Sequence, residues 1–253
     1  YFLGSAPTTS SKPDQITACA LHARLNMTDA IQLDALELET RPDPDATVIW
    51  LHGLGAHGSD FIDAVPELGL PASAALRFVF PHAPVIPVTC NGGYRMRAWY
   101  DILALDASGR RLDADGLFEN RAALRALIAR EQARGIPARR ILLAGFSQGG
   151  ALAYATALTH PEPLGGLIAL STYLPIPERL APEFTVANAD LPLFIAHGAQ
   201  DDVVPPQLGR AAYDQLAEAG YLADWRLYRN LPHAVDRELL RDLGAWIAQQ
   251  LLD

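Results

Sequence analysis

Cysteine and concentrated positive charge are the two things this 253-residue chain lacks most clearly. Its two cysteines, Cys19 and Cys90, lie far apart in segments of different character, so they support neither a disulfide framework nor a cysteine-based metal site. Such cysteine usage is typical of a reducing compartment, and we expect a cytoplasmic protein. Lys and Arg number 20 against 29 Asp and Glu, without a basic run. Nucleic acid and anionic membrane surfaces need concentrated positive charge, and neither is expected as a partner.

Metal-binding spacings and a continuous membrane span are also missing. The seven histidines show no HExxH, HxH or paired CxxC pattern, so we expect no metal and no cofactor. One uncharged run, residues 141–159, approaches the roughly 20 residues that cross a bilayer. Ser147, Gln148 and the glycine pair 149–150 interrupt it near its middle. We expect a buried strand followed by a buried helix there, and no membrane span.

Short, unbroken apolar runs, each ending in a turn, recur along the chain. They are typical of strands buried on both faces of a parallel sheet. An alternating segment that starts at Ile31 predicts in addition a half-buried antiparallel or edge strand. The apolar runs are residues 47–53, 76–82, 141–147, 166–171 and 193–198.

Helical spacing of apolar residues fills the intervals between these runs. It covers Leu117 to Glu131, ending at Gly135, then Leu208 to Leu216, and finally Leu240 to Leu251. Strand and helix therefore alternate. A chain of this length with 50% hydrophobic residues fits one α/β domain, a doubly wound, mostly parallel sheet with helices on both faces.

Residues 1–26 differ from the rest of the chain. They are rich in Ser, Thr and Pro, lack hydrophobic periodicity and stop just before Met27. A secretory signal would need a basic start and an apolar stretch of about seven residues, and neither is present. We expect residues 1–26 to be a non-native or disordered extension, and residues 27–253 to form the domain.

A polar serine stands between glycines in "GFSQGG", residues 145–150. The pattern fits G-x-S-x-G, in which a serine on a strained turn between strand and helix exposes its hydroxyl as a nucleophile. The start of the helix adds a partial positive charge that favours a developing oxyanion. A tight turn with small residues for packing is the alternative. The preceding buried strand and the following helix favour Ser147 as the nucleophile.

A serine nucleophile needs a base that a carboxylate orients. In such folds the chain order is Ser, then Asp or Glu, then His. Two adjacent acids, Asp201 and Asp202, follow the 193–198 run, and His233 is the histidine that comes after both. His233 is therefore predicted as the base, with a surface histidine near a helix start as the alternative. The residue pattern leaves the two aspartates equally placed.

The oxyanion needs two N–H donors. One is predicted to be the backbone N–H of Gln148, the residue after the nucleophile. The second is predicted at Leu54, in the glycine-rich "LHGLGAHG" loop of residues 51–58. A phosphate-binding loop is the rival interpretation of these glycines, but neither G-x-G-x-x-G nor a Walker lysine is present.

Six motifs appear together in a recognisable order: "LHGLG" (51–55), "PHAP" (81–84), "NGGYRMRAWYDI" (91–102), "GFSQGG" (145–150), "HGAQDDVVP" (197–205) and "YRNLPH" (228–233). From about Met27 to Asp253 the chain resembles the phospholipase/carboxylesterase family of α/β-hydrolases. This family includes small bacterial carboxylesterases and the eukaryotic acyl-protein thioesterases.

The resemblance adds several expectations. The family's H-G-x-x-D motif implies that Asp201 is the carboxylate, and the family also implies Leu54 as the second oxyanion donor. It further implies that the loop around Tyr94, Met96 and Trp99 lines the acyl site, and that the protein can form a homodimer. This sequence departs from the family before the histidine, where Leu231 and Pro232 stand, and at His57.

The substrate is predicted from the connections between strands. The segment between residues 171 and 191 is short and proline-containing, so no large helical lid is expected. The longer segment 81–114 forms either an apolar wall beside Ser147 or an ordinary packed loop. We therefore expect a serine carboxylesterase for small acyl esters of short to medium length. The alternatives are acyl-protein thioesterase or lysophospholipase activity, and a non-catalytic ligand receptor.

Overall fold

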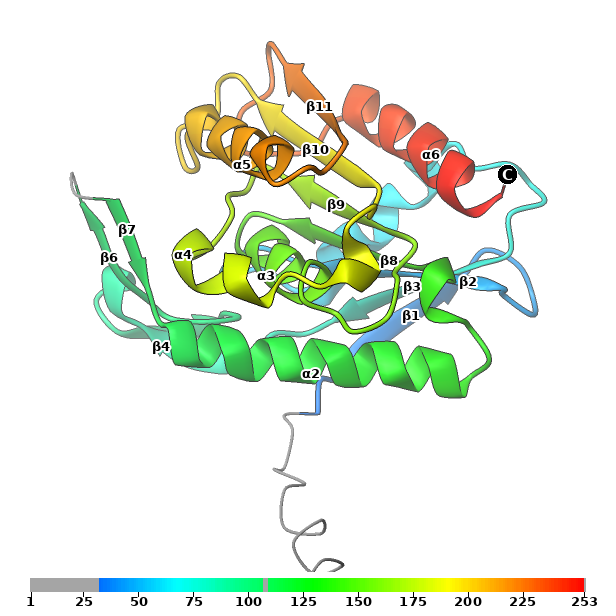
Figure 1. Ribbon diagram of the computed structural model, residues 1–253, viewed down its shortest axis with the longest axis horizontal. Helices are drawn as coiled ribbons and strands as arrows, with labels where there is room; N and C mark the ends of the chain where they lie inside the picture. Colours follow the sequence, from blue (N-terminus) through cyan, green and yellow to red (C-terminus); the bar gives the residue numbers. More distant parts are fainter. Residues whose placement is uncertain (1–31, 107–108, 253) are drawn as a thin grey trace, which may run out of the picture. The chain divides into compact units, whose positions relative to one another are not determined.

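The computed structural model describes residues 32–106 and 109–252. Its main sheet has the order β1-β3-β2-β8-β9-β10-β11 (Figure 1). Edge strand β1 runs antiparallel to β3, and the other neighbours pair in parallel. The strands are β1 (Ala35–Glu39), β2 (Ala46–Leu51), β3 (Leu76–Pro81), β8 (Ile141–Phe146), β9 (Gly166–Leu170), β10 (Leu193–Gly198) and β11 (Ala223–Tyr228). The predicted parallel sheet with an antiparallel edge strand is confirmed, although β1 begins at Ala35.

Helices cover both faces of this sheet. Side chains of β2 alternate between two cores: Ile49 and Leu51 pack on the side of α2, α3 and α5, and Val48 and Trp50 pack on the side of α6. Both faces are therefore dry, which explains the unbroken apolar runs. The helices are α2 (Ala114–Ala133), α3 (Gln148–Ala157), α4 (Pro177–Leu180), α5 (Pro206–Glu218) and α6 (Arg237–Leu251), with 3-10 helices η1 (Gly58–Ala64), η2 (Pro66–Leu68), η3 (Thr89–Asn91), η4 (Ala138–Arg140), η5 (Ala181–Glu183) and η6 (Val186–Asn188).

The helices begin and end at capping residues. The carboxylate of Asp113 accepts a hydrogen bond from the N–H of Asp115 at the start of α2, at 3.2 Å. Asp236 does the same for Leu239 at the start of α6, at 2.9 Å. Beyond α2, Gly135 takes φ +97°, a conformation that favours glycine. Each cap satisfies backbone groups that the helix itself leaves unpaired.

Two antiparallel hairpins occupy the segment between β3 and α2. They are β4 (Val85–Val88) with β5 (Tyr94–Arg97), and β6 (Ile102–Asp106) with β7 (Gly109–Leu112). The sequence left this segment as an apolar wall or a packed loop. Each strand has only four or five residues, and Pro87 lies inside β4. Short strands and an internal proline weaken the strand signal.

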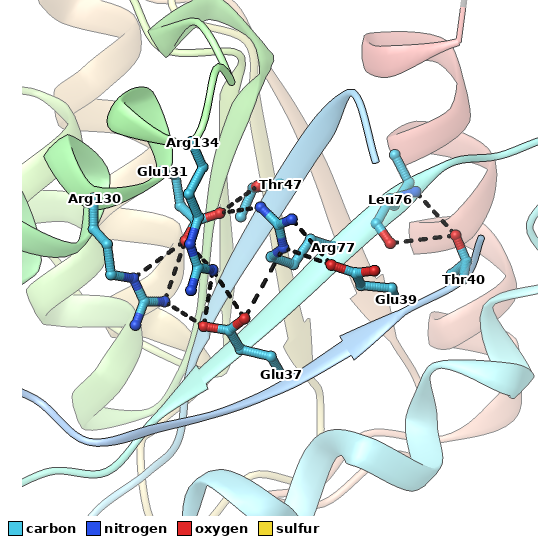
Figure 2. A network of polar contacts seen from close by, with 9 residues as sticks. All are labelled: Glu37, Glu39, Thr40, Thr47, Leu76, Arg77, Arg130, Glu131 and Arg134. Carbon is cyan, nitrogen blue, oxygen red and sulfur yellow. Dashed lines mark hydrogen bonds and ion pairs between the residues drawn. The ribbon is translucent and has the colours of Figure 1, made fainter. Parts of the chain in front are cut away.

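A network of ions ties the edge of the sheet to α2 (Figure 2). The Glu131 side chain is fully buried and pairs with Arg77 at 2.8 Å and with Arg134 at 3.1 Å. It also accepts a hydrogen bond from the hydroxyl of Thr47 at 3.1 Å. Glu37 on β1 continues the network to Arg130 and Arg134. Glu131, which belongs to the helical repeat of α2 by its spacing, is thus a buried charge with several partners.

Two expectations concern the limits of the domain. The predicted extension, residues 1–26, lies outside the described residues, so it stays a prediction together with the domain boundary at Met27.

The segment between β9 and β10 holds only α4, η5 and η6, of which α4 is the longest with four residues. Over the described ranges, none of the helices is long and apolar enough to cross a membrane.

Candidate active site

Ser147 occupies the turn between β8 and α3 with φ 54° and ψ −121°. A non-glycine residue in such a conformation typically costs about 1–3 kcal/mol, so the surroundings must hold it. Its N–H donates to the carbonyl of Leu170 at 2.9 Å, and its carbonyl accepts from the hydroxyl of Thr172 at 2.6 Å. These bonds fix the turn and present the hydroxyl group beyond the end of β8.

Glycines let the turn pack closely against neighbouring backbone. A Cβ atom on Gly149 would lie 2.5 Å from the carbonyl oxygen of His52, and a Cβ on Gly145 would collide with the backbone of Gly149. Any larger residue would push α3 away from β8 or from the loop that follows β2. The glycines of the motif therefore let the β8–α3 turn and the loop after β2 lie close together at the carboxyl ends of the strands.

His233 and Asp201 complete a hydrogen-bonded chain with Ser147. The His233 Nε2 atom lies 3.0 Å from Ser147 Oγ, and Nδ1 lies 2.7 Å from Asp201 Oδ2. The Asp201 side chain is fully buried, and its Oδ1 accepts from the N–H groups of Val203 and Val204 at 3.0 and 2.8 Å. Asp202 points to solvent. The structure thus brings together the three predicted residues, and it places Asp201, not Asp202, against His233.

A second histidine, His197, contacts the loop that carries Asp201. Buried His197 lies with its Nε2 2.8 Å from the carbonyl of Val204 and 3.4 Å from Asp201 Oδ2. Burial lowers the pKa of His197, which keeps its ring neutral near pH 7. This ring packs behind Asp201 and restricts the loop from Asp201 to Val204.

The two predicted oxyanion donors lie beside Ser147. Gln148 is the first residue of α3, and the first four N–H groups of a helix have no partner within it. Leu54 lies in a tight turn that the N–H of Ala56 closes by donating to the carbonyl of Gly53 at 3.2 Å. Leu54 and Gln148 both line the cavity that Ser147 and His233 also line. The two residues predicted as donors and the proposed nucleophile therefore belong to the wall of one cavity.

The cavity above Ser147 has a volume of about 340 Å³. Its wall is mostly apolar, and its charged members are Asp60 and Arg110. In the ranges 32–106 and 109–252, no three His, Cys, Asp or Glu side chains are grouped to hold a metal ion. The wall consists of Gly53, Leu54, Ala56, Asp60, Phe61, Ile102, Arg110, Phe146, Ser147, Gln148, Tyr173, Val203, Val204 and His233.

Comparison with known proteins agrees with this geometry. Residues 37–251 match the phospholipase/carboxylesterase family. The chain belongs to this family. It is 39% identical to acyl-protein thioesterase 1 of Neurospora crassa over 216 residues, which cover 81% of this chain and 87% of that protein. Membership makes the chain a serine hydrolase with the α/β-hydrolase fold, as the sequence predicted.

Solved structures of similar proteins superpose well. Arabidopsis thaliana SOBER1 gives a TM-score of 0.77 at 32% identity, covering 81% of this chain and 99% of that chain. Zea mays acyl-protein thioesterase 2 gives a TM-score of 0.75 at 27% identity, covering 86% and 99%. The shared fold spans nearly the whole of each relative.

The three acyl-site residues that the family resemblance implied are not part of the cavity wall. Tyr94 is 71% exposed at the start of β5. The Met96 sulfur lies 3.4 Å from the side-chain nitrogen of Asn91, and Trp99 is completely buried. The short β4–β5 hairpin carries the first two residues outside the cavity. Ile102, Arg110 and Tyr173 contribute to the wall.

Trp99 instead contacts both segments that carry the predicted oxyanion donors. Its indole Nε1–H donates to the carbonyl of His52 at 2.8 Å, and its backbone N–H donates to Gln148 Oε1 at 2.9 Å. The Gln148 side-chain amide also donates to the carbonyl of Tyr100 at 2.7 Å. One buried residue therefore fixes both the loop that carries Leu54 and the start of α3.

The His52 side chain also fixes the loop that carries Leu54. Its Nε2 accepts from the N–H of Ala83 at 3.1 Å, so Nδ1 carries the hydrogen and donates to the carbonyl of Gly53 at 2.7 Å. Burial lowers the pKa of His52 to about 4, which leaves the ring neutral at physiological pH. The sequence contained no signal for this pair of contacts.

Proposed function

We propose that this protein is a serine carboxylesterase that acts through an acyl-enzyme. Ser147 Oγ attacks the ester carbonyl carbon while His233 Nε2 takes its proton, and Asp201 holds the Nδ1–H of the imidazole. The N–H groups of Leu54 and Gln148 stabilise the oxyanion. His233 returns the proton to the departing alcohol, and water then releases the acid by the same steps. The 3.0 Å approach of His233 Nε2 to Ser147 Oγ is the observation that carries this proposal.

The size of the cavity supports esters of short to medium acyl length. About 340 Å³ is at the lower end of ligand pockets, which typically span roughly 300–1,000 Å³. Leu54, Phe61 and Phe146 supply apolar surface for the hydrocarbon. A long acyl chain would have to leave the cavity and run over exposed surface, which favours shorter chains.

A thioesterase acting on acylated proteins is the second candidate. The relatives from Neurospora crassa and Zea mays carry the name acyl-protein thioesterase, and the chemistry at Ser147 is the same for a thioester. Lysophospholipase activity would use the same chemistry as well. A cytoplasmic location and a homodimer stay predictions.

The test compares 4-nitrophenyl esters of increasing acyl length with an S-acylated peptide, using the wild type and Ser147→Ala. We expect kcat/KM to fall steeply beyond about eight carbons, because a longer chain exceeds the cavity. Ser147→Ala should abolish turnover. A profile that rises to sixteen carbons, or faster release from the S-acylated peptide, favours the thioesterase. Full activity of Ser147→Ala would contradict both candidates.

A further inference from the structure

Arg110 brings a permanent positive charge into the mostly apolar cavity above Ser147. It lies on β7 and lines both this cavity and an adjacent one of about 270 Å³. Tyr173 forms part of both walls as well. The proposed reaction does not use either side chain. A cation that lines the same cavity as the proposed nucleophile is therefore placed to contact the substrate.

The guanidinium group is held in place by stacking. Its Cζ atom lies 4.3 Å from the centroid of the Tyr173 ring. The Tyr173 hydroxyl lies 2.7 Å from that of Tyr100, and both tyrosines are buried, so the ring is a fixed platform. One Nη2–H reaches the carbonyl of Val203 at 3.5 Å, the long limit of a hydrogen bond. In general, a guanidinium group carries its N–H donors along the edge of its plane, so contact of its face with a ring does not occupy them.

The other charged wall residue, Asp60, is engaged in its own turn. Its Oδ2 accepts from the N–H of His57 at 3.2 Å, and Oδ1 lies 3.4 Å from the hydroxyl of Ser59. Asp60 belongs to η1, whereas Arg110 belongs to β7 and contacts the loop after Asp201. The positive charge of Arg110 and the negative charge of Asp60 thus come from different elements of the cavity wall. The rest of the wall is mostly apolar.

We propose that Arg110 binds a carboxylate carried by the substrate, so that the preferred substrates are short esters with an anionic group. The planar N–H edge of arginine matches the two oxygens of a carboxylate, and such charge-assisted bonds are about twice as strong as neutral ones. The apolar wall accommodates the hydrocarbon between the carboxylate and the ester. This inference rests on the proposed function, since Ser147 must still attack the ester.

The test uses two pairs of esters that differ in one charge. Monomethyl glutarate against methyl pentanoate places the carboxylate on the acyl side, and carboxymethyl butyrate against ethyl butyrate places it on the alcohol side. For each pair, the ratio of kcat/KM for the anionic ester to that for the neutral ester is measured. Arg110→Gln should lower this ratio by about 10- to 100-fold in one pair, which also shows the side that carries the charge.

The control is Arg111→Gln, which removes the same charge from the next residue on β7. Arg111 is exposed and does not line the cavity. Its variant should change the ratio by less than about twofold, because solvent and salt screen an exposed charge. Arg110→Lys keeps the charge without the planar edge and should retain part of the preference for the anionic ester. This variant replaces Arg110→Gln in the test if Arg110→Gln folds poorly.

The outcomes separate this inference from the proposed function. If Arg110 only supports Tyr173 and Val203, its variants slow anionic and neutral esters equally and the ratio stays constant, which would overturn the inference. A ratio that falls equally in Arg111→Gln would also overturn it. A wild type that hydrolyses 4-nitrophenyl esters but none of these four would likewise overturn the inference. A wild type that hydrolyses neither set would contradict the proposed esterase instead.

Discussion

At the scale of single residues, the proposed chemistry depends on contacts that hold Ser147 and Asp201 in place. Ser147 keeps its positive φ because Leu170 and Thr172 bind its backbone. Asp201 is oriented by two backbone N–H groups and by the neutral ring of His197 behind it. These contacts hold the proposed nucleophile and acid before any substrate arrives, which is the condition for efficient catalysis at a preorganised site.

The neighbouring aspartates provide a matched pair of variants. Asp201→Asn should lower kcat by about 10,000-fold, because an amide favours the wrong tautomer of His233 and cannot stabilise its charged form. Asp202→Asn should leave kcat within about twofold, because this side chain is exposed. Steady-state kinetics on a 4-nitrophenyl ester measures both. Equal losses in the two variants would argue against Asp201 as the acid.

Trp99 allows a test of the bridge across the oxyanion site. Trp99→Phe keeps an aromatic ring but removes the N–H that binds the His52 carbonyl. We expect kcat to fall by about 10- to 100-fold with little change in KM, since a small displacement of the Leu54 loop weakens a donor used in the transition state.

The control for this change is Trp50→Phe. Trp50 is equally buried, but its indole nitrogen has no hydrogen-bond partner among the described residues, and it packs on the α6 side of the sheet. It should lower the melting temperature without a specific loss of kcat. If both tryptophan variants lose kcat in proportion to stability, Trp99 has no separate role in positioning the site.

At the scale of elements, the parallel strands and the long helices were predictable because each carries its own signal. Strands buried on both faces read as apolar runs, and α2, α5 and α6 show helical spacing with recognisable ends. The β4–β5 and β6–β7 hairpins carry no such signal, since their strands have only four or five residues and Pro87 interrupts β4. The positions of Tyr94, Met96 and Trp99 depend on these hairpins. Residue spacing therefore could not predict where the three side chains lie.

The chain order of Ser147, Asp201 and His233 was more informative than any local pattern around them. Ser147 and Asp201 each follow a predicted strand, and the carboxyl ends of parallel strands lie along one edge of the sheet. Motif logic could therefore bring these residues together. Arg110 was not predicted as a site residue because the sequence contains no strand signal for the β6–β7 hairpin that carries it. The pairing of β6 with β7 places Arg110 in the cavity wall.

The ion network between β1, β3 and α2 gives a prediction about element docking. Glu131→Gln should lower the free energy of unfolding by about 3 kcal/mol, because removing a buried charge leaves its arginine partners poorly compensated. Glu39→Gln, at the 42%-exposed end of the same network, should cost less than about 1 kcal/mol. Urea denaturation measures both values. Equal, small losses would mean that the network adds little to the attachment of α2.

At the scale of the whole molecule, buried histidines couple folding to pH. His52, His160 and His197 are buried, and burial lowers the pKa of each below its ordinary value of 6.5. Such rings stay neutral in the folded protein while the unfolded chain takes up protons below about pH 6.5. Stability is therefore fully present above this pH and decreases as the solution is acidified.

His52 should account for a measurable share of this acid sensitivity. Its pKa of about 4 in the fold, against 6.5 when unfolded, corresponds to roughly 3 kcal/mol lost between pH 6.5 and pH 4. His52→Gln retains an acceptor for the Ala83 N–H but has no titrating ring. The variant should be less stable at pH 7.5 yet lose less stability on going to pH 5, as urea midpoints would record. An unchanged pH dependence would exclude His52 as a contributor.

The central claim is that Ser147 carries the acyl group during turnover. Mass spectrometry of the protein, quenched by acid within milliseconds of mixing with a 4-nitrophenyl ester, tests it directly. The wild type should show one acyl adduct on the peptide that contains Ser147, at a level that matches an initial burst of nitrophenol, and Ser147→Ala should show neither. An adduct on another residue, or nitrophenol release that persists in Ser147→Ala, would contradict the account.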